Sequence, residues 1–273
     1  IGFFIWHTDE KQPVGEIVAD VFDKDCEPMG TKRLAVELDA RSINDWIITT
    51  RNRTGEKNIG FMSAKGCDFQ NQNYNFIIND KCQLPHPRGT QVTDMNLREV
   101  AVYLAVRHSV KRNWLNDRDQ FSEPFDSWSS DIEFQNDCLA YTLFSNSNNI
   151  QSETGMNHWQ PFTENELGIN NELPNHFMTD YITGKKRPII IHGDLFKNEE
   201  ESKEPLAFSK EAMAVFDAGR ELWRYYYRQP DADLNAAYHD IRKYFQGTKL
   251  DKKGKEVMNA TSEDEVYTRL LSA

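Results

Sequence analysis

Residues 209–230 read SKEAMAVFDAGRELWRYYYRQP and carry the clearest helical pattern in the chain. Small and apolar side chains recur there at helical spacing, at Ala212, Phe216, Gly219, Trp223 and Tyr226. This spacing places them on one face of a helix, the face that packs against the rest of a protein. Ser209 is a favoured N-cap residue, and Pro230 cannot continue a helix. The stretch therefore predicts an amphipathic helix between Ser209 and Pro230.

Two further helices are predicted towards the C-terminus. One covers residues 234–245 and stops at Gly247. The other begins at Ser262, which has the spacing of a capping box with Glu265. The C-terminal third of the chain is therefore predicted to be helical.

Segments before residue 209 also show regular patterns. A largely buried helix is predicted over residues 97–110, and the apolar segment 131–144 fits either a helix or a strand. The residues suited to helix N-termini in this region are Thr93 or Asp94, and Thr163 with Glu166 three positions later.

The N-terminal third is predicted to be rich in strands. Residues 16–23 and 31–38 flank a turn-forming segment and predict a hairpin or meander, and residues 74–78 predict a short strand. Residues 51–66 contain three glycines and are predicted to form a loop. Strands followed by helices indicate an α+β (mixed α/β) fold. We expect a strand-rich region over 1–92 and a mainly helical region over 93–273.

The composition limits what the chain can do. A net charge of -11 argues against a surface that binds nucleic acid everywhere, although it leaves room for a local basic stripe. No apolar run is long enough to predict a membrane span. The cysteines lack the spacing of a zinc site, so we expect reduced thiols in a cytoplasmic protein. They are Cys26, Cys67, Cys82 and Cys138.

Familiar catalytic motifs are absent from the sequence. It has no glycine-rich phosphate loop, no nucleophile elbow and no zinc-protease motif. We therefore predict no catalytic, cofactor-binding or metal-binding residue. Asp231 with Asp251, Lys252 and Lys253 resembles a magnesium-dependent nuclease set, but a helix-ending turn and a solvated loop are the better interpretation.

A basic and amide-rich segment follows the helix predicted over 97–110. Arg107, Lys111 and Arg112 lead into NWLNDRDQF, residues 113–121. Cations at a helix C-terminus complement its dipole, so a structural polar cluster explains them. Arginine and asparagine also contact phosphates and base edges, so DNA contact by Asn116 and Arg118 is the alternative.

Several of these segments resemble one protein family. NWLNDRDQF, EFQNDCLAYTLF, NHWQPFTENELG and FSKEAMAVFDAGRELWRYYY are similar to the C-terminal half of bacterial adenine-specific DNA methyltransferases of restriction–modification systems, including the type IIG kind. The resemblance implies S-adenosylmethionine as methyl donor and adenine N6 in DNA as acceptor. The chain has no Pro-Pro pair for the family's catalytic motif and no glycine-rich cofactor loop. We therefore expect those residues elsewhere in a parent protein.

The resemblance implies a fragment that follows the catalytic core. The apolar start at Ile1 and the helical pattern at the C-terminus also lead us to expect a piece of a longer protein. Its partners would be double-stranded DNA and the remaining domains of the parent methyltransferase. We predict a DNA-binding cleft lined by Arg51, Arg53, Lys65, Lys111, Arg112 and Arg118, with Asn116 beside it.

The alternative is a scaffold that docks a catalytic domain, a nuclease domain or another subunit without touching DNA. The long C-terminal helices, with Trp223 and Tyr225 to Tyr227, suit that role. Exposed aromatic residues clustered with the basic residues would favour nucleic acid, and aromatic residues on a separate apolar patch would favour a protein partner.

Overall fold

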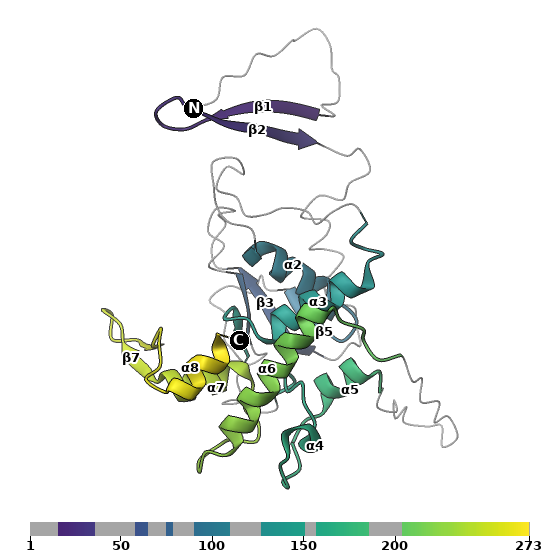
Figure 1. Cartoon of the computed structure of the whole chain (residues 1–273), viewed down its shortest axis with the longest axis vertical. Coiled ribbons are helices and arrows are strands. Elements are labelled where there is room, and N and C mark those ends of the chain that lie inside the picture. The colour runs from purple at the N-terminus through teal and green to yellow at the C-terminus, as the bar shows by residue number, and fades with distance from the viewer. Residues whose placement is uncertain are drawn as a thin grey trace.

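The fold combines helices and sheets, as the sequence predicts. The computed structural model describes residues 16–35, 58–64, 75–78, 90–109, 127–150, 157–185 and 204–272. Within them the strands are β1 (Glu16–Phe22), β2 (Pro28–Ala35), β3 (Asn58–Ala64), β4 (Asn75–Ile78), β5 (Thr90–Thr93), β6 (Asn148–Asn149), β7 (Thr248–Leu250) and β8 (Glu256–Met258). The helices are α2 (Leu97–Ser109), α3 (Ile132–Leu143), α4 (Glu164–Leu167), α5 (Phe177–Thr183), α6 (Lys210–Tyr227), α7 (Tyr238–Gln246) and α8 (Glu265–Leu271). Strands thus dominate the N-terminal part and helices the C-terminal part (Figure 1).

The predicted N-terminal hairpin is confirmed. Antiparallel strands β1 and β2 are joined by a tight turn, in which the Asp23 carboxylate accepts hydrogen bonds from the backbone of Asp25 (2.8 Å) and Glu27 (2.9 Å). Val18 and Phe22, which are four positions apart on β1, are both exposed. The hairpin stands apart from the helices at the top of Figure 1.

A four-stranded sheet lies under the helices, in the order β5-β3-β4-β6. Strand β3 is antiparallel to both neighbours, whereas β6 is parallel to β4. The prediction of a loop over residues 51–66 is wrong for residues 58–64, which form strand β3. A Cβ added to Gly60 would lie 3.0 Å from the Ile78 carbonyl oxygen. Gly60 therefore lies where two strands approach closely, and this approach is possible because glycine has no side chain.

The sheet draws strands from both predicted regions. The boundary between residues 92 and 93 falls inside β5, and β6 comes well after it. The division into 1–92 and 93–273 remains a prediction about domains.

Local signals in the sequence place most helix starts. The undecided segment 131–144 is helix α3, where Asp131 caps the first turn by accepting from the Phe134 N–H at 2.9 Å. Ser209 caps α6 as predicted, accepting from the Ala212 N–H at 3.1 Å. Thr163 and Glu166 form the predicted capping box of α4.

Two helix starts differ from the predictions. Helix α7 begins at Tyr238 rather than at 234, because Asp233 forms a turn with its carboxylate bonded to the Asn235 N–H at 2.8 Å. Helix α8 is capped by Asp264, not Ser262. The Ser262 hydroxyl instead donates to the Phe245 carbonyl at 2.5 Å, which ties the segment to α7.

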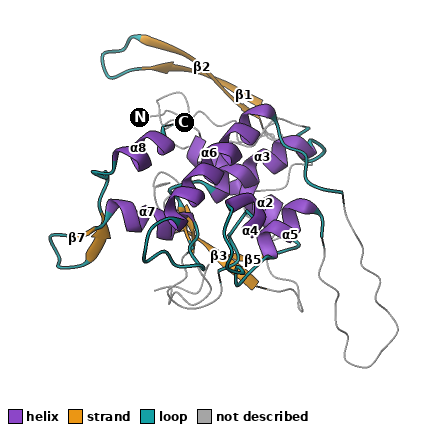
Figure 2. Ribbon diagram, turned by 60° about the horizontal axis from the view of Figure 1, so that its bottom comes forward, coloured by secondary structure: helices purple, strands orange, loops and turns teal. Residues whose placement is uncertain are grey.

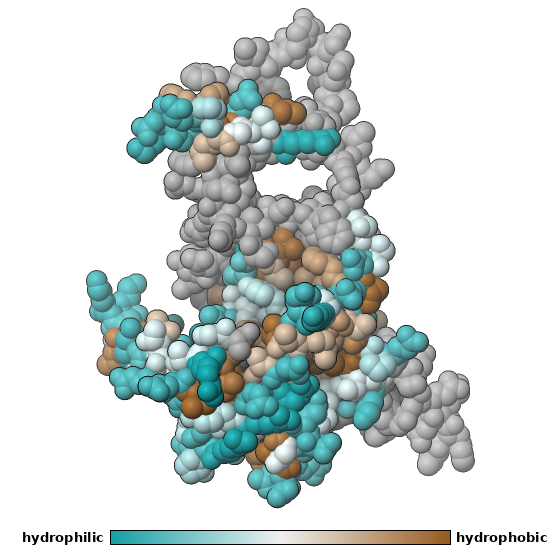
Figure 3. All heavy atoms as spheres, viewed as in Figure 1, coloured by the Kyte–Doolittle hydropathy of each residue, from teal (hydrophilic) through white to brown (hydrophobic). Residues whose placement is uncertain are grey.

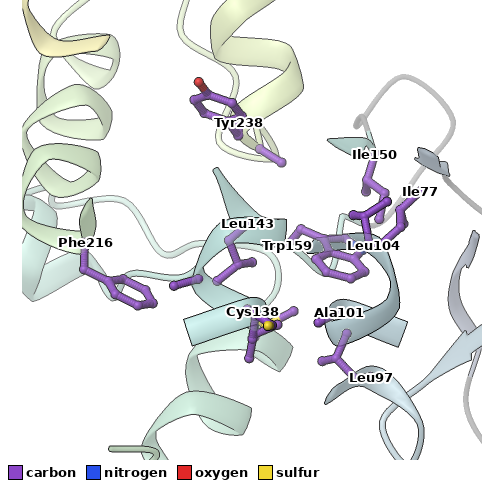
Figure 4. Packing of buried hydrophobic residues seen from close by; sticks show 14 of the residues in the cluster. Ile77, Leu97, Ala101, Leu104, Cys138, Leu143, Ile150, Trp159, Phe216 and Tyr238 are labelled. Atoms are coloured by element: carbon purple, nitrogen blue, oxygen red, sulfur yellow. The ribbon is translucent and has the colours of Figure 1, made fainter. Parts of the chain in front are cut away.

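The main core lies between α2, α3, α6 and the sheet (Figure 2). Figure 4 shows Trp159 with Ile77, Leu104 and Ile150, and shows Phe216 directed from α6 towards Leu143. The ring of Phe144 meets those of Phe216, Trp223, Tyr238 and Phe162, with centroid separations between 5.4 and 6.3 Å. Aromatic rings thus fill the junction between α3 and α6.

Candidate nucleic-acid interface

The residues predicted to contact DNA lie outside the described part of the chain. They are Arg51, Arg53, Lys65, Lys111, Arg112, Asn116 and Arg118. The cleft that they would line, and the role of residues 113–121, stay predictions. The neighbouring cation that the structure does describe is Arg107, and it is buried, with 4% of its surface exposed. Arg107 is therefore an interior residue of α2 rather than a surface phosphate contact.

The segment EFQNDCLAYTLF forms most of α3, and its polar residues hold the start of α6. The Asn136 side chain donates to the Ala207 carbonyl at 2.6 Å. The Asp137 carboxylate accepts from the Ser209 N–H at 3.0 Å. Ser209 is the N-cap of α6, so these two contacts fix where that helix begins.

The first half of the segment NHWQPFTENELG is largely buried, and Trp159 connects it to the sheet. Its indole Nε1 donates to the Ile59 carbonyl at 3.0 Å. Ile59 lies at the irregularity of β3, where the register shifts between Asn58 and Gly60. A bulged residue loses its partner in the ladder. The indole therefore supplies a hydrogen bond that the adjoining strands do not.

Gln160 and Asn157 connect the same segment to the turn before α7. The Gln160 amide donates to the carbonyls of Leu234 and Ala236, the latter at 3.3 Å. The Asn157 amide lies 3.5 Å from the Asp240 carboxylate, which also accepts from the Ala237 N–H. Gln160 and Asn157 are both buried, so their amides serve the interior of the fold.

Glu166 fastens α4 to α6. Its carboxylate accepts from Thr163 and lies 3.3 Å from the Arg220 guanidinium. Its carbonyl accepts two hydrogen bonds from Arg224, at 2.9 and 2.7 Å. Arg220 also covers the face of Phe162, 5.1 Å from the ring centroid. Arg220 and Arg224 therefore both have partners within the chain, although they lie on the outer side of α6.

Two histidines near α5 sit beside polar partners. His176 Nε2 lies 3.0 Å from the Glu164 carboxylate, and His158 Nδ1 lies 3.1 Å from the Asn175 amide. Burial raises the pKa of Glu164, but hydrogen bonds from the backbone N–H groups of Leu173 and Glu164, together with His176, outweigh it and lower that pKa.

An imidazole beside a carboxylate is the geometry of a general base. The Glu164 carboxylate also accepts from the Leu173 N–H at 2.8 Å, and His176 lies at the start of α5. The pair therefore joins the N-terminal ends of α4 and α5, which is a sufficient structural reason for its position.

The two aspartates of the nuclease alternative have structural partners. Asp231 accepts from the Tyr244 hydroxyl at 2.7 Å. Asp251 accepts from the N–H groups of Lys253 and Lys255, at 2.8 and 2.9 Å. These contacts support the turn interpretation. Across the described ranges, no three His, Cys, Asp or Glu side chains are grouped so that they could hold a metal ion.

The aromatic residues of α6 belong to the core. Trp223 and Tyr226 have only 1% and 3% of their surfaces exposed. Tyr225 stacks on Phe245, with centroids 5.3 Å apart, and Tyr227 donates to the Leu234 carbonyl. The expectation that Trp223 and Tyr226 suit a docking surface is therefore wrong.

Comparisons with known proteins give no further information. No protein-family profile, curated protein or solved structure matches the chain. None of the helices that the structure describes is long and apolar enough to cross a bilayer.

Proposed function

We propose that this chain is the DNA-recognition or DNA-clamping part of an S-adenosylmethionine-dependent, adenine-specific DNA methyltransferase of a restriction–modification system. It would follow the catalytic core of the parent protein, and that core would bind S-adenosylmethionine and transfer the methyl group. Its partners would be double-stranded DNA and the other domains of the parent. The protein would be cytoplasmic, because bacterial DNA lies in the cytoplasm.

One observation carries the proposal: three of the segments that resemble this family interlock in space. Asn136 and Asp137 of α3 hold the entry to α6, and Glu166 of α4 is held by Arg220 and Arg224 of α6. Segments that fold as one unit are expected to occur together in the proteins that contain that unit. Their polar side chains are engaged in that unit, which supports a rigid body that positions DNA rather than one that reacts with it.

The second candidate is a scaffold that binds another protein domain. Its support is a set of exposed apolar side chains on the two packed helices α3 and α6. They are Ile132, Tyr141, Met213 and Val215. Exposed apolar side chains are the ones that a protein partner would cover.

Binding of duplex DNA by the 273-residue chain tests the first candidate. Fluorescence anisotropy with a labelled duplex, repeated over a range of salt concentrations, measures both affinity and its electrostatic part. We expect micromolar or tighter binding that weakens steeply with salt, because cations released from phosphates drive it. A chain that fails to bind duplex DNA even at low salt would instead favour the scaffold.

A further inference from the structure

Strands β7 and β8 form a small basic hairpin beyond the end of α7, at the left of Figures 1 and 2. The sequence predicted a solvated loop here. Lys249, Lys252, Lys253 and Lys255 all lie on this hairpin and are exposed. In Figure 3 the same region projects from the left edge and is largely hydrophilic.

The hairpin is held in one shape by hydrogen bonds at both of its ends. At the turn, the Asp251 N–H donates to the Lys255 carbonyl at 2.8 Å, and Gly254 adopts a positive φ of 73°. The Asp251 carboxylate accepts two further N–H groups across this turn. At the base, Asn259 binds the carbonyls of Gly247 and Gln246, at 3.0 and 2.9 Å. Its lysines are therefore presented from a fixed backbone rather than from a loose loop.

The charge of the hairpin is opposite to that of the chain. Residues 248–258 contain four lysines and two acidic residues, Asp251 and Glu256, so the segment is net positive, whereas the whole chain has a net charge of -11. Within the described residues none of these four lysines forms an ion pair with a carboxylate. In contrast, Arg220 and Arg224 of α6 are paired with acidic residues. The hairpin therefore carries a net positive charge, and its lysines have no carboxylate partner within the described residues.

We propose that the β7–β8 hairpin contacts the phosphate backbone of duplex DNA. A two-stranded ribbon fits a groove of the duplex, and lysine binds phosphate as a mobile point charge. Leu250 lies between Lys249 and the turn and is 72% exposed, so an apolar side chain is available to touch sugars or base edges. This inference rests on the proposed function, and it assigns the DNA contact to a segment that the sequence analysis interpreted as a solvated loop or, alternatively, as part of a nuclease-like set.

The test compares two variants that each remove two exposed lysines. Lys252→Ala with Lys253→Ala changes the hairpin, and Lys185→Ala with Lys210→Ala is the control with the same change in net charge. Both are made in the 273-residue chain, and circular dichroism checks that each is folded. The probe is a labelled duplex of arbitrary sequence, titrated by anisotropy over a range of salt concentrations.

We expect the hairpin variant to lower the slope of log affinity against log salt by about 1.8, because each phosphate contact contributes about 0.9. If affinities extrapolated to 1 M salt are equal, its affinity at about 0.1 M salt falls about 60-fold. The control variant keeps the slope of the unmodified chain.

Three results would overturn the inference, and they are distinguishable. Equal slopes for both variants, with strong binding by the unmodified chain, would remove the hairpin from the interface and leave the proposed function standing. No binding by the unmodified chain at low salt would overturn both. Displacement of the duplex by polyglutamate as efficiently as by unlabelled duplex would make an acidic protein surface the partner instead.

Discussion

Replacing Trp159 and Trp223 separately by phenylalanine tests how the sheet is tied to the rest of the fold. Both tryptophans have only 1% of their surface exposed, and both substitutions remove the same atoms. They differ in one respect. Trp159 Nε1 donates to the Ile59 carbonyl at 3.0 Å, whereas Trp223 Nε1 has no hydrogen-bond partner in the described structure.

The magnitude follows from that difference. The loss of packing is similar for the two variants and largely cancels when they are compared. Trp159→Phe also leaves the Ile59 carbonyl buried without its partner, which costs about 1–3 kcal/mol. Trp223→Phe removes a buried donor that is already unpaired, so its removal incurs no such cost. We therefore expect Trp159→Phe to be the more destabilising variant by about 2 kcal/mol.

Urea unfolding followed by far-UV circular dichroism measures this difference without relying on tryptophan fluorescence. The free energy of unfolding of each variant is compared with that of the unmodified chain. Amide hydrogen exchange at Ile59 and Gly60 provides a local check, because it should accelerate in Trp159→Phe only. Equal destabilisation by the two substitutions, with equal exchange, would refute the role assigned to the indole of Trp159.

Three further predictions concern single sites. Gly219→Ala should destabilise the chain by about 1 kcal/mol, because the new Cβ would clash with the Phe144 ring and this overpacking outweighs the better helix propensity of alanine. In a Phe144→Leu background the same change should stabilise, and urea unfolding would decide. Native alkylation followed by mass spectrometry should label exposed Cys26 and spare Cys138, whose pKa burial raises to about 12. Burial also raises the pKa of Tyr226 to about 12, so its contribution to stability is complete below pH 10 and is lost between about pH 10 and 12, as an alkaline unfolding series would measure.

Helix α6 could be predicted from sequence because its signals are local. Ser209, the apolar spacing and Pro230 all lie within the helix or next to it, and the structure confirms each. Strand β3 could not be predicted in this way. Gly60 indicates a loop when only its neighbours in sequence are considered, but the contact that requires a glycine is with Ile78 and Ile150. Information that resides in distant contacts is absent from a local pattern.

The cap of α8 shows the same limit on a smaller scale. Ser262 and Asp264 are both suitable N-cap residues. The hydrogen bond from Ser262 to the Phe245 carbonyl, which depends on the packing of α7, leaves Asp264 to cap the helix. The predicted DNA-binding residues lie outside the described part of the chain, and their grouping stays a prediction. The lysine hairpin was missed because Asp251, Lys252 and Lys253 were weighed as a nuclease-like set or a solvated loop, and the pairing of β7 with β8 was not predicted.

The strand order of the four-stranded sheet has a consequence for the synthesis of the chain. Ile77 of β4 pairs in parallel with Asn148 of β6, and the Ile59 carbonyl accepts its hydrogen bond from Trp159. Pairing between such distant segments requires closure of a long loop, which slows folding. During translation, β3 and β4 therefore emerge long before their final partners. The sheet lacks its last strand until β6 has left the ribosome, and it lacks the hydrogen bond at its bulge until Trp159 has followed, so β3 and β4 depend on the timing of later segments.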